Sequence, residues 1–502
     1  MSNAHRNDEF GRAASPGVCE YDISADELLR ALLRLAPERR VQILDSGGAR
    51  GADEARFLIA GFDPFETIEA RGDELIIQRR DEAFAGVERG SSLLSLLDER
   101  LARYRVVRPG ARETSHLPVA GGACIASFAY DFARRFQRLR SRPPAALAAP
   151  EPDAALAFYD TLVVHDYAQC STFLVSVAGE PQLARAREAL GEARQAGGFD
   201  AADDDVRGHT IAESNFTRAE YVAAVRRIKR HIFAGDIYQA NLTQQFTCPL
   251  SAGDTAERVF LRLRRAHPAS FAAFLRRLED TVISASPERF LRVSPDDGGE
   301  RGRRVEAWPI KGTRGRGATA REDARLREEL RRSAKDAAEN VMIVDLLRND
   351  LGRVCRYGTI EVAALCEVQE HPTLFHLVSK VRGQLRAEVT AGELLRATFP
   401  CGSITGAPKL RAMEIIDACE RAPRGLSMGA VGYFSFDGRI DLSVAIRTLT
   451  LRRDSGTARF NVGGGIVAES DPDSEYEESL VKARALLGAL GARGESSAAV
   501  NI

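Results

Sequence analysis

The sequence is poor in lysine, tryptophan and methionine: six lysines stand against 64 arginines among its 70 basic residues, beside one tryptophan and four methionines. No apolar run approaches the roughly 18 residues that a membrane span needs, which argues against a membrane protein. Its eight cysteines form no C-x-x-C pair and its eight histidines no H-E-x-x-H spacing, so neither a zinc site nor a disulfide framework is indicated. A formal charge of −1 with no aromatic-interleaved basic patch indicates no nucleic-acid partner.

The composition is that of a globular protein, with 44% hydrophobic and 28% charged residues over 502 positions. We expect a polar, disordered extension over residues 1–20, with no signal-peptide core, and therefore a cytoplasmic protein. A glycine- and aspartate-rich stretch over residues 195–213 is the clearest break in hydrophobic patterning. It predicts a boundary between an N-terminal region, residues 21–200, and a second region, residues 215–490.

Hydrophobic periodicity predicts strands and helices in an irregular order rather than as a repeated strand–helix unit. The predicted strands are 41–44, 56–60, 74–78, 154–165, 172–177, 282–286, 430–436, 441–451 and 458–462. The predicted helices are 91–104, 217–234, 320–351, 410–420 and 474–487. This order favours an α+β fold with large antiparallel sheets.

Lys311 lies in the run Trp308-Pro-Ile-Lys-Gly-Thr-Arg314, between a short apolar segment and a Gly-Thr turn. Since this chain uses arginine where a positive charge suffices, each lysine is a candidate for a role that arginine cannot fill. A desolvated lysine can lose its proton and act as an amine nucleophile, whereas arginine cannot. Biased codon usage is the ordinary explanation for a leftover lysine, but the turn after Lys311 would aim its side chain into a cleft.

Glu339 falls on the apolar face of the helix predicted for residues 320–351, because Ile343 and Leu347 follow it at i+4 and i+8. A buried carboxylate needs a cation. The cation is either Lys335, four residues earlier, or a metal ion, and the spacing alone leaves both open.

Glu475, Glu478 and Lys482 share one face of the last predicted helix. An acidic first turn favoured by the helix dipole explains the two glutamates equally well. A divalent ion held by Glu339 and one of them, completed by water and substrate, is the usual way in which proteins bind Mg²⁺. The glycines of residues 463–465 lie just before this helix and would let backbone amides approach an anion.

Three further segments carry candidate groups. The Gly/Ser/Thr loop of residues 401–409 leads through a proline into a helix, which is typical of an anion site and also of an ordinary helix start. Glu288 follows a predicted strand, where burial would raise its pKa towards use as a general acid; a surface ion pair with Arg289 is the alternative. His376 is either a core residue or a catalytic one.

Together and in this order, these segments resemble the chorismate-utilising enzymes. The matching runs are SPERF at 286–290, PIKGTRGRG at 309–317, KDAAENVMIVDLLRNDLGRV at 335–354, HLVS at 376–379, SITGAPKLRAMEII at 403–416 and GGGIV from 463. They cover about residues 215–490, and the N-terminal region matches the corresponding region of anthranilate synthase component I more loosely. The resemblance implies antiparallel sheets packed as a sandwich with flanking helices.

The resemblance also implies a chorismate site. In it, Mg²⁺ would be held by Glu339 and Glu478 with Glu475 nearby, and Glu288 would be the general acid/base with His376 beside the ring. The residues that would bind substrate are Gly312, Thr313, Thr405, Tyr433, Arg447, Gly463, Gly464, Gly465 and Lys482.

Within the family, the chain is most similar to the branch that aminates chorismate at C4, component I of the aminodeoxychorismate synthases. Anthranilate synthases usually have Ala in place of Lys311, and isochorismate-forming relatives have a water-activating lysine in place of Gln239. The sequence shows no glutamine amidotransferase domain, so the resemblance implies a partner glutaminase subunit. Anthranilate synthase component I, or a non-catalytic subunit of the same fold, are the alternatives. Residues 45–46 and 267–271 depart from the tryptophan-binding pattern of anthranilate synthases, which makes a tryptophan site doubtful.

Overall fold

The computed structural model describes residues 17–48, 55–82, 85–106, 116–139, 151–196, 210–295, 302–371 and 374–494. Within them the chain forms two large sheets, antiparallel except where β11 pairs with β25. The first sheet has thirteen strands in the order β1 (Gly17–Glu20), β10 (Ser171–Ser176), β9 (Thr161–Asp166), β3 (Phe57–Gly61), β2 (Gln42–Asp45), β13 (Phe271–Arg276), β14 (Asp280–Ser286), β23 (Thr448–Arg452), β24 (Thr457–Ile466), β12 (Gln239–Pro249), β11 (Thr210–Ser214) and β25 (Ala492–Gly494), with β20 (Gly406–Ala407) beside β12. The second has twelve strands in the order β17 (Ile310–Gly315), β19 (Leu374–Gln384), β16 (Arg304–Ala307), β15 (Arg289–Val293), β22 (Ile440–Val444), β21 (Ala430–Ser435), β7 (Ala123–Phe128), β8 (Ala154–Tyr159), β4 (Glu66–Arg71), β5 (Glu74–Arg79) and β6 (Gly86–Arg89), with β18 (Glu361–Glu370) beside β19.

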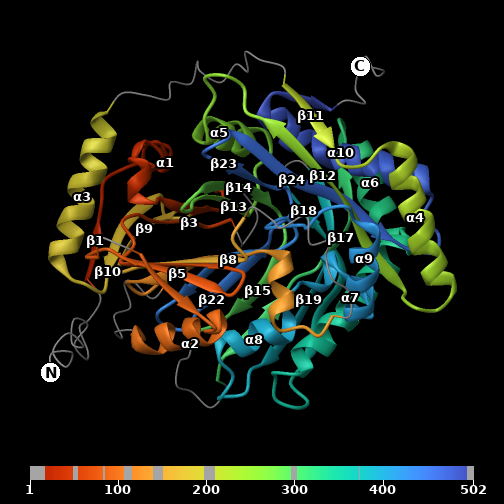
Figure 1. The fold of residues 1–502 in the computed structure, drawn as a ribbon, viewed down its shortest axis with the longest axis horizontal. Coiled ribbons are helices and arrows are strands. Elements are labelled where there is room, and N and C mark those ends of the chain that lie inside the picture. The colour runs from red at the N-terminus through yellow and green to blue at the C-terminus, as the bar shows by residue number, and fades with distance from the viewer. Residues whose placement is uncertain are drawn as a thin grey trace.

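Helices cover the outer faces of both sheets. They are α1 (Ala25–Arg34), α2 (Leu93–Arg103), α3 (Glu180–Gln195), α4 (Arg218–Phe233), α5 (Ala256–Ala266), α6 (Ala320–Arg332), α7 (Ala334–Gly352), α8 (Ala391–Thr398), α9 (Lys409–Cys419) and α10 (Pro472–Leu490), with short 3₁₀ turns η1 (Pro37–Arg39), η3 (Tyr130–Arg135) and η5 (Gly402–Ile404). In Figure 1, α1 and α3 lie at one side of the molecule and α4, α9 and α10 at the other.

Successive side chains of a strand point to opposite faces of its sheet, and this alternation explains how the layers pack. On β2, Ile43 packs with α1, α3 and α5, while its neighbour Leu44 packs between the two sheets. A third core lies between the second sheet and helices α2, α7 and α8. The α+β sandwich with flanking helices is therefore confirmed.

Three predicted elements are each two elements in the structure. The strand predicted for 154–165 is β8 and β9, which belong to different sheets and are separated by the buried Asp160. The strand predicted for 441–451 is β22 and β23, again in different sheets, and Arg447 between them has a positive φ of 48°. Apolar patterning continues through both corners because each strand remains buried. The helix predicted for 320–351 breaks at Ser333, whose hydroxyl caps the start of α7 by accepting from the Asp336 amide.

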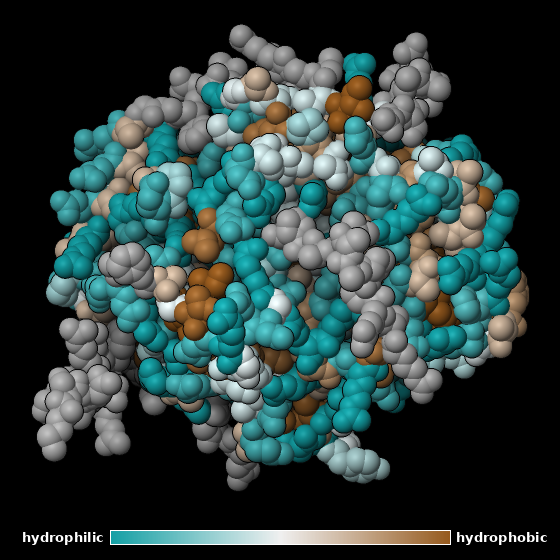
Figure 2. Space-filling model, in the orientation of Figure 1, coloured by the Kyte–Doolittle hydropathy of each residue, from teal (hydrophilic) through white to brown (hydrophobic). Residues whose placement is uncertain are grey.

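In each sheet, the strands of the N-terminal region form one block that joins a block of strands from the rest of the chain, at the pair β2 and β13 in the first sheet and at the pair β7 and β21 in the second. Gly17–Glu20 form β1, so the extension predicted for residues 1–20 does not include these four residues; residues 1–16 lie outside the described part of the chain. Most of the boundary predicted within 195–213 also lies outside it. No helix among the described residues is long and apolar enough to cross a membrane. Figure 2 shows hydrophilic side chains over most of one face of the molecule.

Candidate active site

The predicted site residues come from both sheets and from two helices. Strand β12 and the glycines of β24 belong to the first sheet, and β17 and β19 belong to the second. Helix α7 contacts β17, β19 and the η5 loop, and α10 contacts β24. This arrangement brings segments that are far apart in the sequence to one region.

Lys311 and Glu288 both contact Ser403. The ladder between β17 and β19 shifts register between Ile310 and Thr313, which frees Lys311 from regular pairing. Its Nζ donates to the carbonyl oxygen of Ser403 at 3.3 Å. Glu288 is 4% exposed, and burial raises the pKa of its carboxyl group, against the opposing effects of a Ser403 hydrogen bond and the Lys311 charge. Its Oε1 has no hydrogen-bond partner among the described residues, so this carboxyl group is free to exchange a proton with a ligand.

His376 is a neutral imidazole in this site. It lies opposite Thr313 across β17 and β19, with 3.0 Å between the threonine hydroxyl and Nδ1. Burial, with a smaller contribution from the charges of His371 and Arg447, lowers the pKa of His376 to about 3. The preceding residue of β17, Gly312, has φ +79°, and a Cβ there would stand 2.8 Å from Asp336. Both the backbone conformation and the space at this position therefore require glycine.

Glu339, Glu475 and Glu478 act electrostatically on one another or on Lys311. Burial raises the pKa of Glu339 on α7 and of Glu475 on α10, and the charge of Glu475 raises that of Glu339 further. The pKa of Glu478 is lowered because the Lys482 charge and hydrogen bond outweigh burial. Lys335 lies 3.9 Å from Glu475 and forms no ion pair with Glu339, so the intrahelical pair considered from the sequence is absent.

An oxygen-preferring divalent cation fits this carboxylate set, because burial and, to a smaller extent, the neighbouring carboxylates disfavour the charged forms of Glu339 and Glu475, and a cation would offset both effects. Among the described residues, no three His, Cys, Asp or Glu side chains are grouped closely enough to hold a metal ion by themselves. An ion here would therefore take part of its coordination shell from substrate and water.

The glycines of β24 keep this region open to a ligand. Residues 463–465 pair with residues 241–243 of β12. A Cβ on Gly464 would stand 3.1 Å from Glu475 Oε2, 3.5 Å from Lys482 Nζ and 3.8 Å from Glu478 Oε1. A Cβ on Gly465 would stand 2.4 Å from the side-chain nitrogen of Gln239. A side chain at position 464 would occupy the space beside the carboxylates, and one at position 465 would collide with Gln239.

Two cations of the site differ in their partners. Lys482 Nζ donates to Gly463 O and pairs with Glu478 Oε1, both at 2.8 Å. Arg447 forms no side-chain hydrogen bond or ion pair with any described residue, and burial lowers the pKa of its guanidinium group. A desolvated guanidinium without a partner is suited to bind a carboxylate.

The sequence matches the family described as chorismate binding enzyme over residues 44–488. The chain belongs to this family. It is 38% identical to aminodeoxychorismate synthase component 1 of Klebsiella aerogenes over 456 residues, which cover 90% of this chain and 94% of the relative. It is 35% identical to anthranilate synthase component 1 of Thermus thermophilus over 461 residues, 92% and 94% of the two chains. The crystal structure of anthranilate synthase component I from Streptococcus pneumoniae superposes with a TM-score of 0.72 at 27% identity, covering 87% of this chain and 93% of that one.

Two of the predicted substrate-binding residues lie differently from expectation in this chorismate-binding enzyme. Tyr433 on β21 lines a cavity with Ser46, Phe271 and Asp441, and none of the other predicted site residues lines that cavity. Because side chains alternate along β21, the side chain of Tyr433 points towards the space between the two sheets. The hydroxyl of Thr405 is fully buried and donates to carbonyl oxygens of its own loop, Cys401 O at 3.1 Å and Gly402 O at 3.2 Å. It therefore shapes the loop.

Two cations that no sequence pattern indicated, the largely buried Lys409 and the buried Arg424, hold the loop around Ser403. Lys409 Nζ pairs with Asp350 at 2.6 Å and donates to the carbonyl oxygens of Thr398 and Pro400. Arg424 pairs with Glu420 and donates to Ile404 O at 2.8 Å and Asn241 O at 2.7 Å. The scarcity of lysine could have pointed to Lys409, whereas nothing in the sequence distinguishes Arg424 from the other arginines.

Proposed function

We propose that this enzyme aminates chorismate at C4 with ammonia to give 4-amino-4-deoxychorismate, a precursor of 4-aminobenzoate and folate. The observation that carries the proposal is the position of Lys311, whose charge acts on Glu288, Glu339 and Glu478 together. A lysine at this position is expected in the aminodeoxychorismate branch and not in anthranilate synthases. The similarity to the Klebsiella aerogenes protein supports the same branch.

In the proposed reaction, Lys311 passes a proton to Glu288, and the resulting neutral amine attacks C2 of chorismate while the C4 hydroxyl leaves as water. Glu288 supplies the proton for that water, which its raised pKa favours. Ammonia then adds at C4 and expels the lysine amine, and the ammonium group formed at C4 returns a proton to Glu288. The neutral His376 lies where it can contact the ring without repelling Arg447.

The remaining residues would bind the two carboxylates of chorismate. Arg447 would pair with one of them, helped by Lys482 and by the amides of residues 463–465. Mg²⁺, held by Glu339 and Glu478 with Glu475 nearby, would neutralise a substrate carboxylate when bound. Thr313 and Gly312 would line the pocket beside His376.

Ammonia would come from a separate glutamine amidotransferase subunit, forming a heterodimer with this chain. The Klebsiella aerogenes relative is named as component 1, which supports a partner component. We place the activity among the transaminase-class transferases of the cytoplasm, and a separate lyase would release pyruvate from the product.

Two substitutions of Lys311 test the proposal with chorismate, Mg²⁺ and ammonium. Lys311→Ala is expected to lose most product formation while still binding chorismate. Lys311→Arg keeps the positive charge but cannot supply a neutral amine, so it should be equally inactive. Product formation at the native rate by either variant would exclude Lys311 as the nucleophile.

Anthranilate synthase activity is the second candidate, favoured by the similarity to the Thermus thermophilus protein. It adds ammonia at C2 and eliminates pyruvate without a lyase. Fluorescent anthranilate formed by the purified chain with ammonium would overturn our assignment in favour of this activity.

A further inference from the structure

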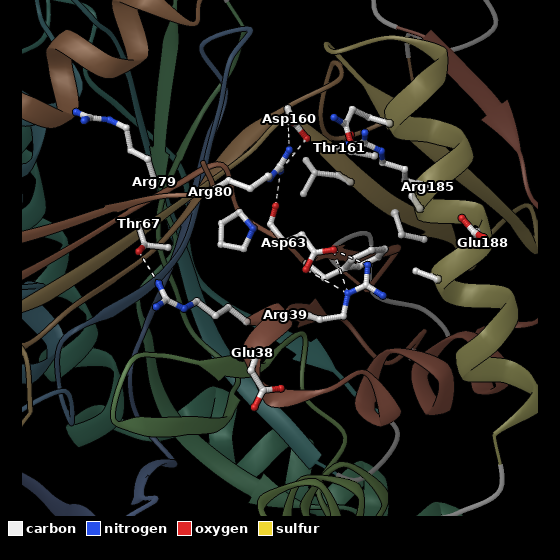
Figure 3. A pocket seen from close by; sticks show the side chains of 18 of the residues that line it. Glu38, Arg39, Asp63, Thr67, Arg79, Arg80, Asp160, Thr161, Arg185 and Glu188 are labelled. Atoms are coloured by element: carbon white, nitrogen blue, oxygen red, sulfur yellow. Dashed lines mark hydrogen bonds and ion pairs between the residues drawn. The ribbon is translucent and has the colours of Figure 1, made fainter. Parts of the chain in front are cut away.

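A cavity of about 600 Å³ lies in the N-terminal region, and none of the predicted active-site residues lines it. Its walls come from η1, the hairpin of β4 and β5, the corner between β8 and β9, and α3. Figure 3 shows Arg185 and Glu188 on α3 across the cavity from Thr67. The volume is within the range of about 300–1,000 Å³ typical of small-molecule sites.

Five arginines line the cavity, and three of them are neutralised by carboxylates. Arg39 pairs with Asp63, and Arg80 pairs with Asp160 at 2.9 Å (Figure 3). Arg79 pairs with Glu66 and Glu82. These three arginines therefore offer little uncompensated positive charge to an anionic ligand.

Arg40 differs from them because its guanidinium group has only neutral partners. It donates to the hydroxyl of Thr67 at 2.6 Å and to the amide oxygen of Gln78, and no described carboxylate lies within ion-pair distance. Thr67 and Gln78 face each other across β4 and β5, so the hairpin holds the guanidinium group from one side. Arg40 also has a φ of 47°, an uncommon conformation for a residue with a side chain.

A guanidinium group that is partly desolvated and has no acidic partner is costly in the empty protein. Burial lowers the pKa of Arg40 in spite of the opposing charge of Glu69, which forms no ion pair with it, and the charge of Arg453 adds to the effect of burial. The cost falls when an anion supplies the missing charge and accepts the remaining N–H donors.

We propose that this cavity is a second ligand site, which takes a small organic anion with its carboxylate or phosphate group at Arg40. The apolar part of the ligand would lie against Phe62, Leu162 and Ala186. Glu38 and Glu188 are exposed and also line the cavity, so polyanions would be repelled.

Gln78→Glu tests the proposal in the full-length protein. The new carboxylate would stand where the Gln78 amide oxygen already accepts from Arg40, so it would neutralise the guanidinium group from within. We expect this variant to be at least as stable as the native protein, which separates loss of binding from loss of folding. Gln169→Glu makes the same change of charge at an exposed residue outside the cavity and is the matched control.

Binding of benzoate and of inorganic phosphate is measured by isothermal titration, and the two probes distinguish carboxylate from phosphate ligands. Gln78→Glu should weaken binding of whichever probe the native protein takes by at least about tenfold, the effect of losing one charge-assisted interaction. Gln169→Glu should bind as the native protein does. Arg447→Gln should also bind normally, because Arg447 belongs to the proposed active site and not to this cavity.

Three results would overturn the proposal: no binding of either probe, native affinity in Gln78→Glu, or loss of binding in Arg447→Gln. The last result would place the probe in the proposed active site.

Discussion

Replacing Arg447 with glutamine should have opposite effects on stability and on chorismate binding. The guanidinium group is largely buried with no partner among the described residues, so the empty protein bears its desolvation cost. Removing the charge should raise the free energy of unfolding by about 0.5–2 kcal/mol, the usual gain when a functional but unfavourable group is removed. If the group binds a substrate carboxylate, the same change removes a charged hydrogen bond worth about 1.5–3 kcal/mol. Chorismate affinity should then fall roughly ten- to a hundredfold.

The same substitution at Arg424 is the control. Arg424 is more deeply buried than the half-buried Arg447 and pairs with Glu420, which would be left as an uncompensated buried charge. Arg424→Gln should therefore lower the free energy of unfolding by roughly 3–5 kcal/mol. Urea unfolding followed by the fluorescence of the single tryptophan, Trp308, measures both variants, and titration of chorismate without ammonia measures affinity. A destabilised Arg447→Gln with native affinity would refute this reasoning.

Gly464→Ala, Glu339→Gln and His376→Asn give three further predictions. A Cβ on Gly464 would stand 3.1 Å from Glu475 Oε2, so Gly464→Ala should raise the Mg²⁺ concentration needed for half-maximal activity. The free energy of unfolding should change by less than about 1 kcal/mol. An unchanged metal response would contradict the proposed role of Glu475. Glu339→Gln should raise the same Mg²⁺ concentration at least about tenfold, with Glu367→Gln on β18 as an exposed control that should respond as the native enzyme does. The pKa of His376 is about 3 in the folded protein, whereas an unfolded histidine takes a proton below about pH 6.5. The contribution of His376 to stability is therefore complete above about pH 6.5 and is lost as the pH falls towards 3. Unfolding at several pH values should show this loss at up to about 1.4 kcal/mol per pH unit in the native protein, and the slope should be reduced in His376→Asn; equal slopes would show that His376 titrates normally.

Sequence patterning predicted the helices and strands well where a predicted element stays within one layer of the fold. Helix α4 begins at Arg218, and Thr217 before it forms the expected capping box with Glu220. Patterning failed where the chain passes from one sheet to the other, because the strands on both sides of Asp160 and of Arg447 are buried and read as one apolar run. It also could not show that strands of the N-terminal region pair with strands from the rest of the chain, since pairing joins residues far apart in the sequence.

Individual site residues were predictable where their chemistry is unusual for this chain. Lys311 could be selected because lysine is rare and because its local motif is specific. Arg447 was expected from the family resemblance, but its lack of a partner emerges only from the packing around it. Tyr433 lies in an aromatic-containing strand that reads equally well with either face towards a ligand, and the structure turns it towards another cavity. Arg40 gave no sequence signal, because its distinction is the neutral side chains around it.

The most direct test of the central claim is the mass of the protein after reaction with chorismate and Mg²⁺ without ammonia. We predict an adduct with the mass of chorismate less one water, located by peptide mapping on Lys311 and absent from Lys311→Ala. Addition of ammonium should remove the adduct and release 4-amino-4-deoxychorismate. An adduct on another residue, or full activity of Lys311→Ala, would contradict a covalent role for Lys311.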